Sequence, residues 1–266
     1  MGPGFVLAAN DVTASSADNR GGAGASTSRR VAAVVSIAAP TADVRVLRME
    51  VVAGPSLTFE AGQYVQVVFA GLPPRDYSLA NTPSAAVLEF HVRVNAERGV
   101  GRHIRDRLAV GDRVSVVGPF GDAFLRREHT GPMLAVAGGT GLVPIRSIVD
   151  TALGSGMRQP IHLYVGAREP LDLYDEPYFR ALAGRYPNLQ WVPVISGTGA
   201  AAGRRTGNVA DAVAADFRSL TGFKAYVAGP PAMVEATQRV LADRGVLARD
   251  IHADPFTAGD HHSSAR

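Results

Sequence analysis

Three short segments bring together charged, aromatic, hydroxyl and glycine residues at spacings that could bind a ligand. The first is Arg75-Asp76-Tyr77-Ser78-Leu79-Ala80-Asn81, directly after the turn at Pro73-Pro74. Because side chains alternate along a strand, we expect the arginine, the aromatic ring and the hydroxyl to share one face. A guanidinium suits a pyrophosphate, and a phenol ring with a hydroxyl suits the ribityl chain and ring system of a flavin dinucleotide. An amphipathic strand with a surface arginine and a packed tyrosine is the alternative.

The second segment is Arg98-Gly99-Val100-Gly101-Arg102-His103-Ile104, between a strand that ends at Val94 and a short helix that closes before Gly111-Asp112. Glycines at a strand-to-helix turn let backbone N–H groups approach an anion, and the positive end of the helix dipole adds to the attraction. A phosphate could therefore bind there. A plain turn accounts equally well for the glycines, and Gly118-Pro119-Phe120-Gly121 could also be only a turn.

The third segment, Gly138-Gly139-Thr140-Gly141-Leu142-Val143-Pro144, follows a buried strand and opens a helix with a proline in its first turn. A nucleotide phosphate loop needs this context, although a glycine-rich turn alone is a weak signal. Downstream, Ala228-Gly229-Pro230-Pro231-Ala232-Met233 ends another strand and opens another helix. Both turns should lie at one carboxyl edge of a parallel sheet, where ligands of such sheets bind.

The elements that position these segments fall into two regions that differ in their hydrophobic pattern. The first region reads as short alternating strands with glycine and proline punctuation, typical of a small antiparallel barrel or sandwich. The second region, after Gly131-Pro132, alternates apolar runs with helix-length segments, which predicts a parallel sheet covered on both faces. The predicted strands are Val31–Ile37, Asp43–Val51, Tyr64–Phe69 and Val87–Val94, then Met133–Ala137, Ile161–Val165, Leu189–Ile195 and Ala225–Ala228, and the predicted helices are Leu142–Leu153, Glu176–Ala183, Asn208–Phe217 and Ala232–Arg244.

The predicted domain boundary lies near residue 128, which gives a barrel domain over 30–128 and an α/β domain over 129–256. Residues 1–29 contain few large apolar side chains, and we expect a disordered leader. Residues 257–266 are small and polar, and we expect a flexible tail whose His261-His262 pair is solvated.

Composition narrows the classes of protein. The 266 residues are 46% hydrophobic and 19% charged, as in globular proteins, and suffice for two lobes. The absence of cysteine excludes disulfides, a cysteine nucleophile, thiolate metal sites and an iron–sulfur cluster held by four thiolates. No apolar run approaches the roughly 20 residues of a membrane span, and a net charge of +3 with scattered basic residues argues against nucleic acid. We expect a cytoplasmic protein without a metal site.

Taken together and in this order, the segments resemble those of the ferredoxin–NADP reductase superfamily, in particular the reductase components of bacterial oxygenases. The resemblance covers about residues 31–256. Arg75 to Ser78 corresponds to the flavin motif, Gly138 to Pro144 to the nicotinamide loop, and Gly229 to Met233 to the second nucleotide motif. It implies an antiparallel β-barrel FAD-binding domain followed by an α/β parallel-sheet NAD(P)-binding domain, with FAD as cofactor and NADH or NADPH as electron donor. Gly118-Pro119-Phe120-Gly121 and His252-Ala253-Asp254-Pro255-Phe256 also resemble segments of these reductases.

The resemblance also implies roles for individual residues. Arg75 would hold the FAD pyrophosphate, Tyr77 would pack on the flavin, and Ser78 would hydrogen-bond near the flavin N5. Phe256 would lie near the isoalloxazine, and with Tyr77 and Ser78 it completes the implied catalytic set. The flavin site would continue through His91, Val92, Arg93, Val94, Gly99, Val100, Gly101 and Arg102; Gly139, Thr140 and Gly141 would bind the nicotinamide pyrophosphate, Arg168 would lie near the adenosine ribose, and Gly229, Pro230, Pro231 and Met233 would border the nicotinamide.

Three departures from the family pattern bear on function. Arg102 stands where the family often has serine or threonine, which could replace a hydroxyl contact by a charge or shift the alignment by one residue. Ala228 stands where many relatives have a cysteine. Oxygenase reductases usually carry a plant-type [2Fe–2S] domain, but this chain has no cysteines to hold such a cluster. No iron–sulfur cluster is therefore expected in this chain.

The function implied is transfer of electrons from NAD(P)H through FAD to a separate acceptor, such as a ferredoxin or an oxygenase component. One alternative is an NAD(P)H-dependent reductase of free flavin. Another is a non-catalytic flavin-binding module that senses redox state or scaffolds a complex. Arg168 is followed by Glu169, and Arg204-Arg205 lies further on, so the residues offer groups for either nucleotide. The resemblance favours NADH.

Overall fold

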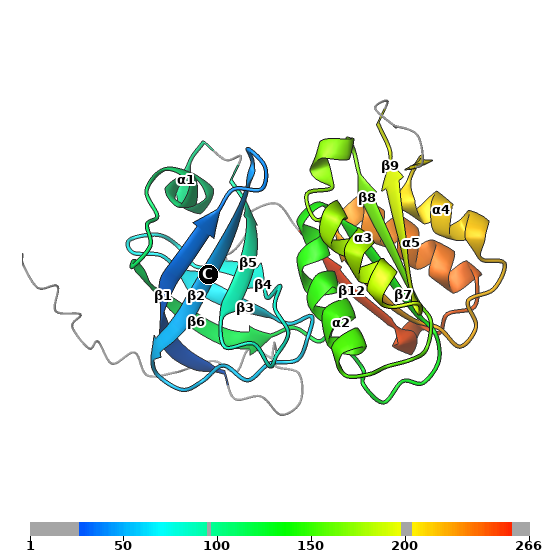
Figure 1. Cartoon of the computed structure of the whole chain (residues 1–266), viewed down its shortest axis with the longest axis horizontal. Coiled ribbons are helices and arrows are strands. Elements are labelled where there is room, and N and C mark those ends of the chain that lie inside the picture. Colours follow the sequence, from blue (N-terminus) through cyan, green and yellow to red (C-terminus); the bar gives the residue numbers. More distant parts are fainter. Residues whose placement is uncertain (1–26, 95–96, 198–203, 257–266) are drawn as a thin grey trace, which may run out of the picture.

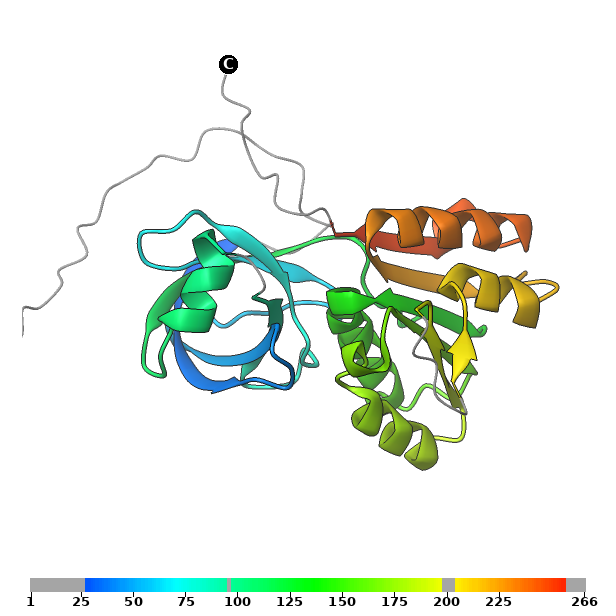
Figure 2. The same ribbon diagram turned by 90° about the horizontal axis from the view of Figure 1, so that it is seen from above.

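The computed structural model describes residues 27–94, 97–197 and 204–256, which form two lobes side by side (Figure 1). In the first lobe, six antiparallel strands in the order β4-β3-β6-β1-β2-β5 curve into a nearly closed barrel (Figure 2). Its elements are β1 (Ser28–Ala38), β2 (Val44–Ala53), β3 (Tyr64–Val68), β4 (Arg75–Ser78), β5 (Leu88–Arg93), α1 (Gly99–Asp106) and β6 (Arg113–Phe120).

Alternation along the barrel strands places one set of side chains inside. Along β5, Leu88, Phe90 and Val92 enter the barrel core, which also holds Leu47 and Met49 of β2. The residues between them, Glu89 and His91, are also buried, because the second lobe covers the outer face of β5. The inner face of β5 therefore packs in the barrel core, and its outer face packs against the second lobe.

The second lobe is a six-stranded parallel sheet in the order β10-β9-β8-β7-β11-β12. Helices α2 and α3 cover one face of the sheet, and α4 and α5 cover the other (Figure 1). The elements are β7 (Met133–Gly138), η1 (Gly139–Gly141), α2 (Leu142–Gly154), β8 (Ile161–Ala167), η2 (Pro170–Asp172), α3 (Glu176–Arg185), β9 (Leu189–Ile195), β10 (Arg205–Thr206), α4 (Val209–Asp216), β11 (Lys224–Gly229), α5 (Pro231–Asp243), η3 (Ala248–Asp250) and β12 (Ile251–Pro255).

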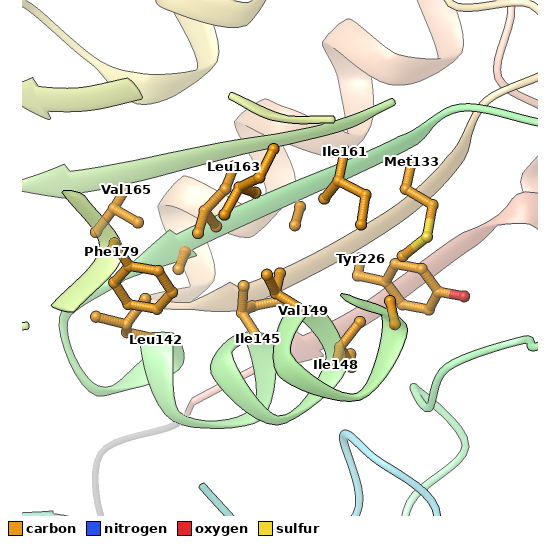
Figure 3. Close-up of a cluster of buried hydrophobic side chains, with 14 of the residues drawn as sticks. Met133, Leu142, Ile145, Ile148, Val149, Ile161, Leu163, Val165, Phe179 and Tyr226 are labelled. Carbon is orange, nitrogen blue, oxygen red and sulfur yellow. The ribbon is translucent and has the colours of Figure 1, made fainter. Parts of the chain in front are cut away.

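The central strand β7 is apolar throughout because both of its faces are covered. Met133, Ala135 and Ala137 pack toward α2 and α3, whereas Leu134 and Val136 pack toward α4 and α5. On the first of these faces, Ile145, Ile148 and Val149 of α2 lie against Leu163 and Ile161 of β8 (Figure 3). This dry contact fixes α2, and with it the glycine turn that precedes it, on the sheet.

The lobes also share hydrophobic packing. Ala61 of the barrel and Leu125 of the connecting segment belong to the same buried cluster as α2, and the Leu125 amide donates to the Ala61 carbonyl at 2.9 Å. A methyl group added to Gly62 would meet the Ile148 side chain at 2.9 Å. The Arg126 amide donates to the Tyr226 hydroxyl at 2.8 Å. The barrel therefore packs closely against α2.

Both predicted architectures are confirmed, and the eight strands and four helices predicted from the sequence are present, with shifts at their ends. Interpreting Gly118 to Phe120 as a turn is wrong, because these residues end β6, where Gly118 pairs with Ser28 and Phe120 with Tyr64. The strands β6, β10 and β12 were not predicted as strands. Ser28 and Arg29, which the prediction placed in the leader, belong to β1. Residues 1–26 and the predicted tail over 257–266 lie outside the described residues. Among described residues, no helix is long and apolar enough to span a bilayer.

Candidate functional site

The flavin motif forms β4 at the edge of the barrel sheet. Its register with β3 sets Arg75 opposite Val67, Tyr77 opposite Val65 and Ser78 opposite Tyr64. Arg75 and Tyr77 therefore share a face, and Ser78 lies on the other. The expectation that all three share one face is wrong for Ser78, because it is the immediate neighbour of Tyr77.

Arg75 and Tyr77 have environments that suit an anionic, flat ligand. The guanidinium of Arg75 is partly exposed, and the hydrogen bond it makes within the described residues is to the neighbouring Pro74 carbonyl at 3.1 Å. The Tyr77 ring contacts Phe69 and Phe90 edge-on, at centroid distances of 6.5 and 6.3 Å. Burial raises the pKa of the Tyr77 phenol well above its usual value, so it stays neutral. Arg75 thus offers a cation with donors to spare, beside a fixed aromatic ring.

Helix α1 adds a phosphate-compatible turn near this ring. Its His103 ring lies 5.7 Å from Phe69, which also contacts Tyr77. Gly99 has φ +72°, and a side chain added there would meet nothing within 4 Å. The N-cap residue Arg98 carries no hydrogen-bond acceptor, so its side chain cannot bond to the first N–H groups of the helix. This open turn fits a pyrophosphate.

Other predicted flavin-site residues have side chains turned elsewhere. Val92, Val94 and Val100 are buried in the barrel core, so they could reach a cofactor only through the backbone. Arg102 is exposed and pairs with Asp106 at 3.3 Å. The His91 side chain is only 1% exposed and faces the second lobe, where its Nδ1 lies 3.0 Å from the Tyr174 hydroxyl. Side-chain contact of His91 with a flavin is therefore not supported.

The nicotinamide loop and the second nucleotide motif meet backbone to backbone. A methyl group on Gly141 would lie 2.2 Å from the Ala228 carbonyl oxygen, and one on Gly229 would lie 2.7 Å from the Gly138 oxygen. Gly139, at φ +56°, faces open space in which the nearest neighbour of an added methyl would be Arg93 Nη2 at 3.7 Å. The prediction that both turns lie at one carboxyl edge is confirmed. Only glycine permits the close backbone contacts at Gly141 and Gly229, and the open space at Gly139 leaves room for a ligand.

The order of strands aligns the remaining predicted residues along this edge. The Phe256 amide donates to the Gly229 carbonyl at 2.7 Å, next to Pro230, Pro231 and Met233 at the start of α5. From β12 through β11 and β7 to β8, the edge runs from Phe256 past Gly229 and Thr140 to the exposed Arg168. This sequence of positions suits an extended dinucleotide.

The end of β12 faces the flavin strand. Burial, together with the charges of Asp122 and Asp76, raises the pKa of Asp254 to about 6. Asp76 stands between Arg75 and Tyr77 on β4, so Asp254 lies close enough to this strand for the charges to interact. Phe256 follows directly after β12, and its amide bond to Gly229 holds it at the carboxyl edge of the sheet.

A buried ionic cluster between the lobes was missed by the sequence reasoning. Arg146 Nη1 lies 3.3 Å from Glu89 Oε1 and 3.2 Å from Asp175 Oδ2. Although burial alone would raise it, hydrogen bonds from His91 and Arg48 and the charge of Arg146 hold the pKa of Glu89 at about 2. The usable signal is the alternation of Glu89, His91 and Arg93 with apolar residues along β5, which gives the strand one polar face. No group of three or more described histidine, aspartate or glutamate side chains has an arrangement that could hold a metal.

The barrel offers a guanidinium beside an aromatic ring and an open helix turn, and the parallel sheet offers interlocked glycine turns. Together these features are those of a two-domain oxidoreductase that uses a flavin and a nicotinamide nucleotide. Two family models match accordingly. The oxidoreductase FAD-binding domain matches residues 32–124, and the oxidoreductase NAD-binding domain matches residues 135–239.

Relatives agree with these matches. The ferredoxin–NAD(P)+ reductase component of the naphthalene 1,2-dioxygenase/salicylate 5-hydroxylase systems of a Ralstonia species is 48% identical over 224 residues, 84% of this chain and 67% of that protein. The corresponding naphthalene 1,2-dioxygenase component of Pseudomonas putida is 40% identical over 226 residues, 85% of this chain and 68% of that protein. The crystal structure of a cytochrome P450 reductase of Amycolatopsis, 38% identical, aligns with a TM-score of 0.79 over 86% of this chain and 70% of that chain.

The chain therefore belongs to the ferredoxin–NADP reductase superfamily, and it is an NAD(P)H-dependent flavoprotein reductase with FAD as its cofactor. It spans about two thirds of the length of the two dioxygenase reductases. When bound, FAD would supply the redox chemistry, taking hydride from a nicotinamide nucleotide and passing electrons on, and the chain would supply binding, orientation and electrostatics.

Proposed function

We propose that this reductase takes electrons from NADH and delivers them to a separate protein, a ferredoxin or an oxygenase component. The observation that carries the proposal is the interlocked pair of glycine turns at Gly141 and Gly229, with the Phe256 amide bonded to the Gly229 carbonyl beside them. A nicotinamide held there would lie between the two lobes. The names of the two dioxygenase reductases support the choice of acceptor.

The roles of the site residues follow from the same proposal. Arg75 and the first turn of α1 bind the FAD pyrophosphate, Tyr77 packs on the flavin and Ser78 tunes its reacting edge. Gly139 and Thr140 bind the nicotinamide pyrophosphate. Val92 to Val94 and Gly99 to Arg102 contribute backbone contacts, and Arg168 lies by the adenosine. Hydride transfer does not require the protein to remove a proton, so these residues orient and polarise the two cofactors.

NADH is favoured over NADPH because the paired arginines are already engaged. Arg204 Nη2 lies 2.7 Å from Glu176 Oε2, and Arg205 is paired with Asp216. A 2′-phosphate would have to compete with these carboxylates. The exposed Glu169, two residues after β8 ends, would instead suit free ribose hydroxyls.

The other two functions are distinguished by how the flavin is held and whether it turns over. A reductase of free flavin needs weak retention, whereas the spare guanidinium of Arg75 and the open turn at Gly99 favour retained FAD. A non-catalytic module would bind FAD without being reduced by either nucleotide. We place the activity in the cytoplasm, where reduced nicotinamide nucleotides circulate, as part of the same proposal.

Acceptor transfer tests this proposal. The purified protein is mixed anaerobically with excess NADH and either a [2Fe–2S] ferredoxin or free flavin, and the mixture is then passed through a desalting column. We expect the ferredoxin absorbance to bleach at a rate proportional to reductase concentration, with FAD still on the protein after the column. Reduced flavin in the small-molecule fraction, with no ferredoxin reduction, would replace the proposal by the free-flavin reductase.

A further inference from the structure

The interlobe cluster joins the outer face of β5 to the start of α2 and α3. Its members are polar side chains of which none is more than partly exposed: Glu89, His91, Arg146, Asp150, Tyr174, Asp175 and Tyr178. Two lie on the barrel, and five lie on the second lobe. Contacts within it therefore cross between the domains assigned to the two cofactors.

Arg146 is at the centre of the cluster. Its guanidinium, 18% exposed, reaches Glu89 Oε1 at 3.3 Å across the interface, and Asp175 Oδ2 at 3.2 Å and Asp150 Oδ2 at 3.6 Å on its own lobe. It also stacks over the Tyr178 ring at 4.4 Å, and the Tyr178 hydroxyl donates to Asp150 at 2.8 Å. One planar cation therefore holds three carboxylates from both lobes.

His91 makes a second crossing contact. Its Nε2 lies 3.0 Å from Glu89 Oε1, and its Nδ1 lies 3.0 Å from the Tyr174 hydroxyl. Ser147, next to Arg146, donates through its hydroxyl to the Asn81 carbonyl at 2.7 Å, and the Asn81 side chain accepts from the Glu89 amide at 2.8 Å. The segment after the flavin motif is thereby tied to the same turn of α2.

The cluster is also near the nicotinamide loop. Arg146 is on α2, which starts directly after Gly139 to Gly141. On the barrel side, Arg93 follows His91 on the outer face of β5 and is the nearest group to the open side of Gly139. A small rotation of one lobe about the cluster would shift this loop relative to the flavin strand.

We propose that Arg146 is a positioning residue that sets the geometry between the two cofactors by bracing α2 against β5, an inference that rests on the proposed function. A contribution to folding stability does not explain why an arginine occupies position 146, because a buried ion pair stabilises a fold little compared with well-packed apolar residues. The lobes are already packed through Gly62, Ile148 and Leu125. The planar guanidinium of Arg146 directs Nη1 to Glu89 and Asp175 and Nε to Asp150 while it stacks on Tyr178, which fixes its orientation. Hydride transfer depends steeply on orientation.

Arg146→Lys tests the proposal, because lysine keeps the charge but loses the planar fork. Its matched control is Arg249→Lys, at a residue of η3 whose side chain is 82% exposed. Both variants are purified with FAD and reduced anaerobically over a range of NADH concentrations in a stopped-flow instrument. We expect Arg146→Lys to lower the limiting rate of flavin reduction by about 10- to 100-fold and to weaken the long-wavelength absorbance of stacked nicotinamide and flavin. Bound FAD and the apparent Kd for NADH should change less than about threefold, a difference of under 1 kcal/mol.

Hydrogen exchange supplies a readout that needs no nucleotide. We expect amides in 88–93 and 142–149 to exchange faster in Arg146→Lys than in the control. An unchanged limiting rate or unchanged exchange would overturn the proposal, as would a rate that falls only in proportion to lost FAD. If NADH fails to reduce the wild-type protein, the proposed function is wrong, and the exchange result still decides whether Arg146 braces the lobes.

Discussion

At the scale of single residues, the site separates groups that hold a cofactor from groups that tune it. Arg75 has donors available for a ligand, while Tyr77 is held by Phe69 and Phe90. Ser78 lies on the opposite face of the same strand and opposite Tyr64. Loss of Arg75 and loss of Ser78 should therefore have different consequences.

Arg75→Ala should release FAD. A charge-assisted hydrogen bond contributes about 1.5–3 kcal/mol, so FAD affinity should fall by about 10- to 100-fold, measured by fluorescence titration of the apoprotein. Arg113→Ala, at an exposed position of β6, is the control. Equal FAD affinity in the two variants would remove Arg75 from the pyrophosphate site.

Ser78→Ala should leave FAD bound and slow its reduction. The hydroxyl is proposed to bond near the reacting nitrogen, and one neutral hydrogen bond of about 0.5–1.5 kcal/mol corresponds to a rate change of about 2- to 10-fold. Stopped-flow reduction by NADH measures it, with the exposed Ser84→Ala as control. Wild-type kinetics in Ser78→Ala would exclude a tuning role.

Asp254 should make stability depend on pH. Its pKa is raised to about 6 in the folded chain by burial and by the charges of Asp122 and Asp76, from an ordinary value of 3.8. The folded state therefore binds the proton more tightly, and the free energy of unfolding falls as pH rises from about 4 to about 6. Asp254→Asn should be more stable than wild type above pH 6, by up to about 3 kcal/mol, with the difference shrinking below pH 4. Urea unfolding at several pH values measures it, with the exposed Asp243→Asn as control, and a pH-independent difference would contradict the assignment.

At the scale of elements, periodicity predicted most of the molecule because the strongest signals come from buried strands and long helices. The run Met133–Ala137 is apolar on both faces, and it forms the centre of the parallel sheet. Strand β6 was not predicted because Gly118-Pro119 looks like a turn. Strand β12 was not predicted because His252 and Asp254 interrupt an apolar pattern. Their positions depend on pairing with β1, β3 and β11, which are distant in sequence.

The turn between β7 and α2 gives a test at this scale. Gly141→Ala would put a methyl group 2.2 Å from the Ala228 carbonyl oxygen, so the two nucleotide turns must separate. We expect destabilisation by about 1–3 kcal/mol and weaker NADH binding, with FAD retained. Gly154→Ala, at the open end of α2 where nothing lies within 4 Å, is the control and should be neutral or stabilising. Thermal unfolding and NADH titration of both variants measure these effects, and equal behaviour would show that the close approach is not needed.

At the scale of the whole molecule, the division into two cofactor lobes was predictable, but their junction was not. Motif order places flavin residues on the barrel and nucleotide residues on the sheet edge. Which faces meet depends on contacts such as Arg146 with Glu89 and Ser147 with Asn81, which join residues more than 50 positions apart. No local pattern encodes such pairs, and the same reason explains why His91 was assigned to the flavin instead of the interface.

The central claim is that one chain holds FAD and lets NADH reduce it. The most direct measurement is an anaerobic titration of the purified, full-length chain with NADH, followed by NADPH on a second sample, while the flavin absorbance is recorded. We expect a yellow protein that bleaches with about one equivalent of NADH per FAD and responds less readily to NADPH. A colourless protein that oxidises NADH only when flavin is added, or a yellow protein that neither nucleotide bleaches, would contradict the account.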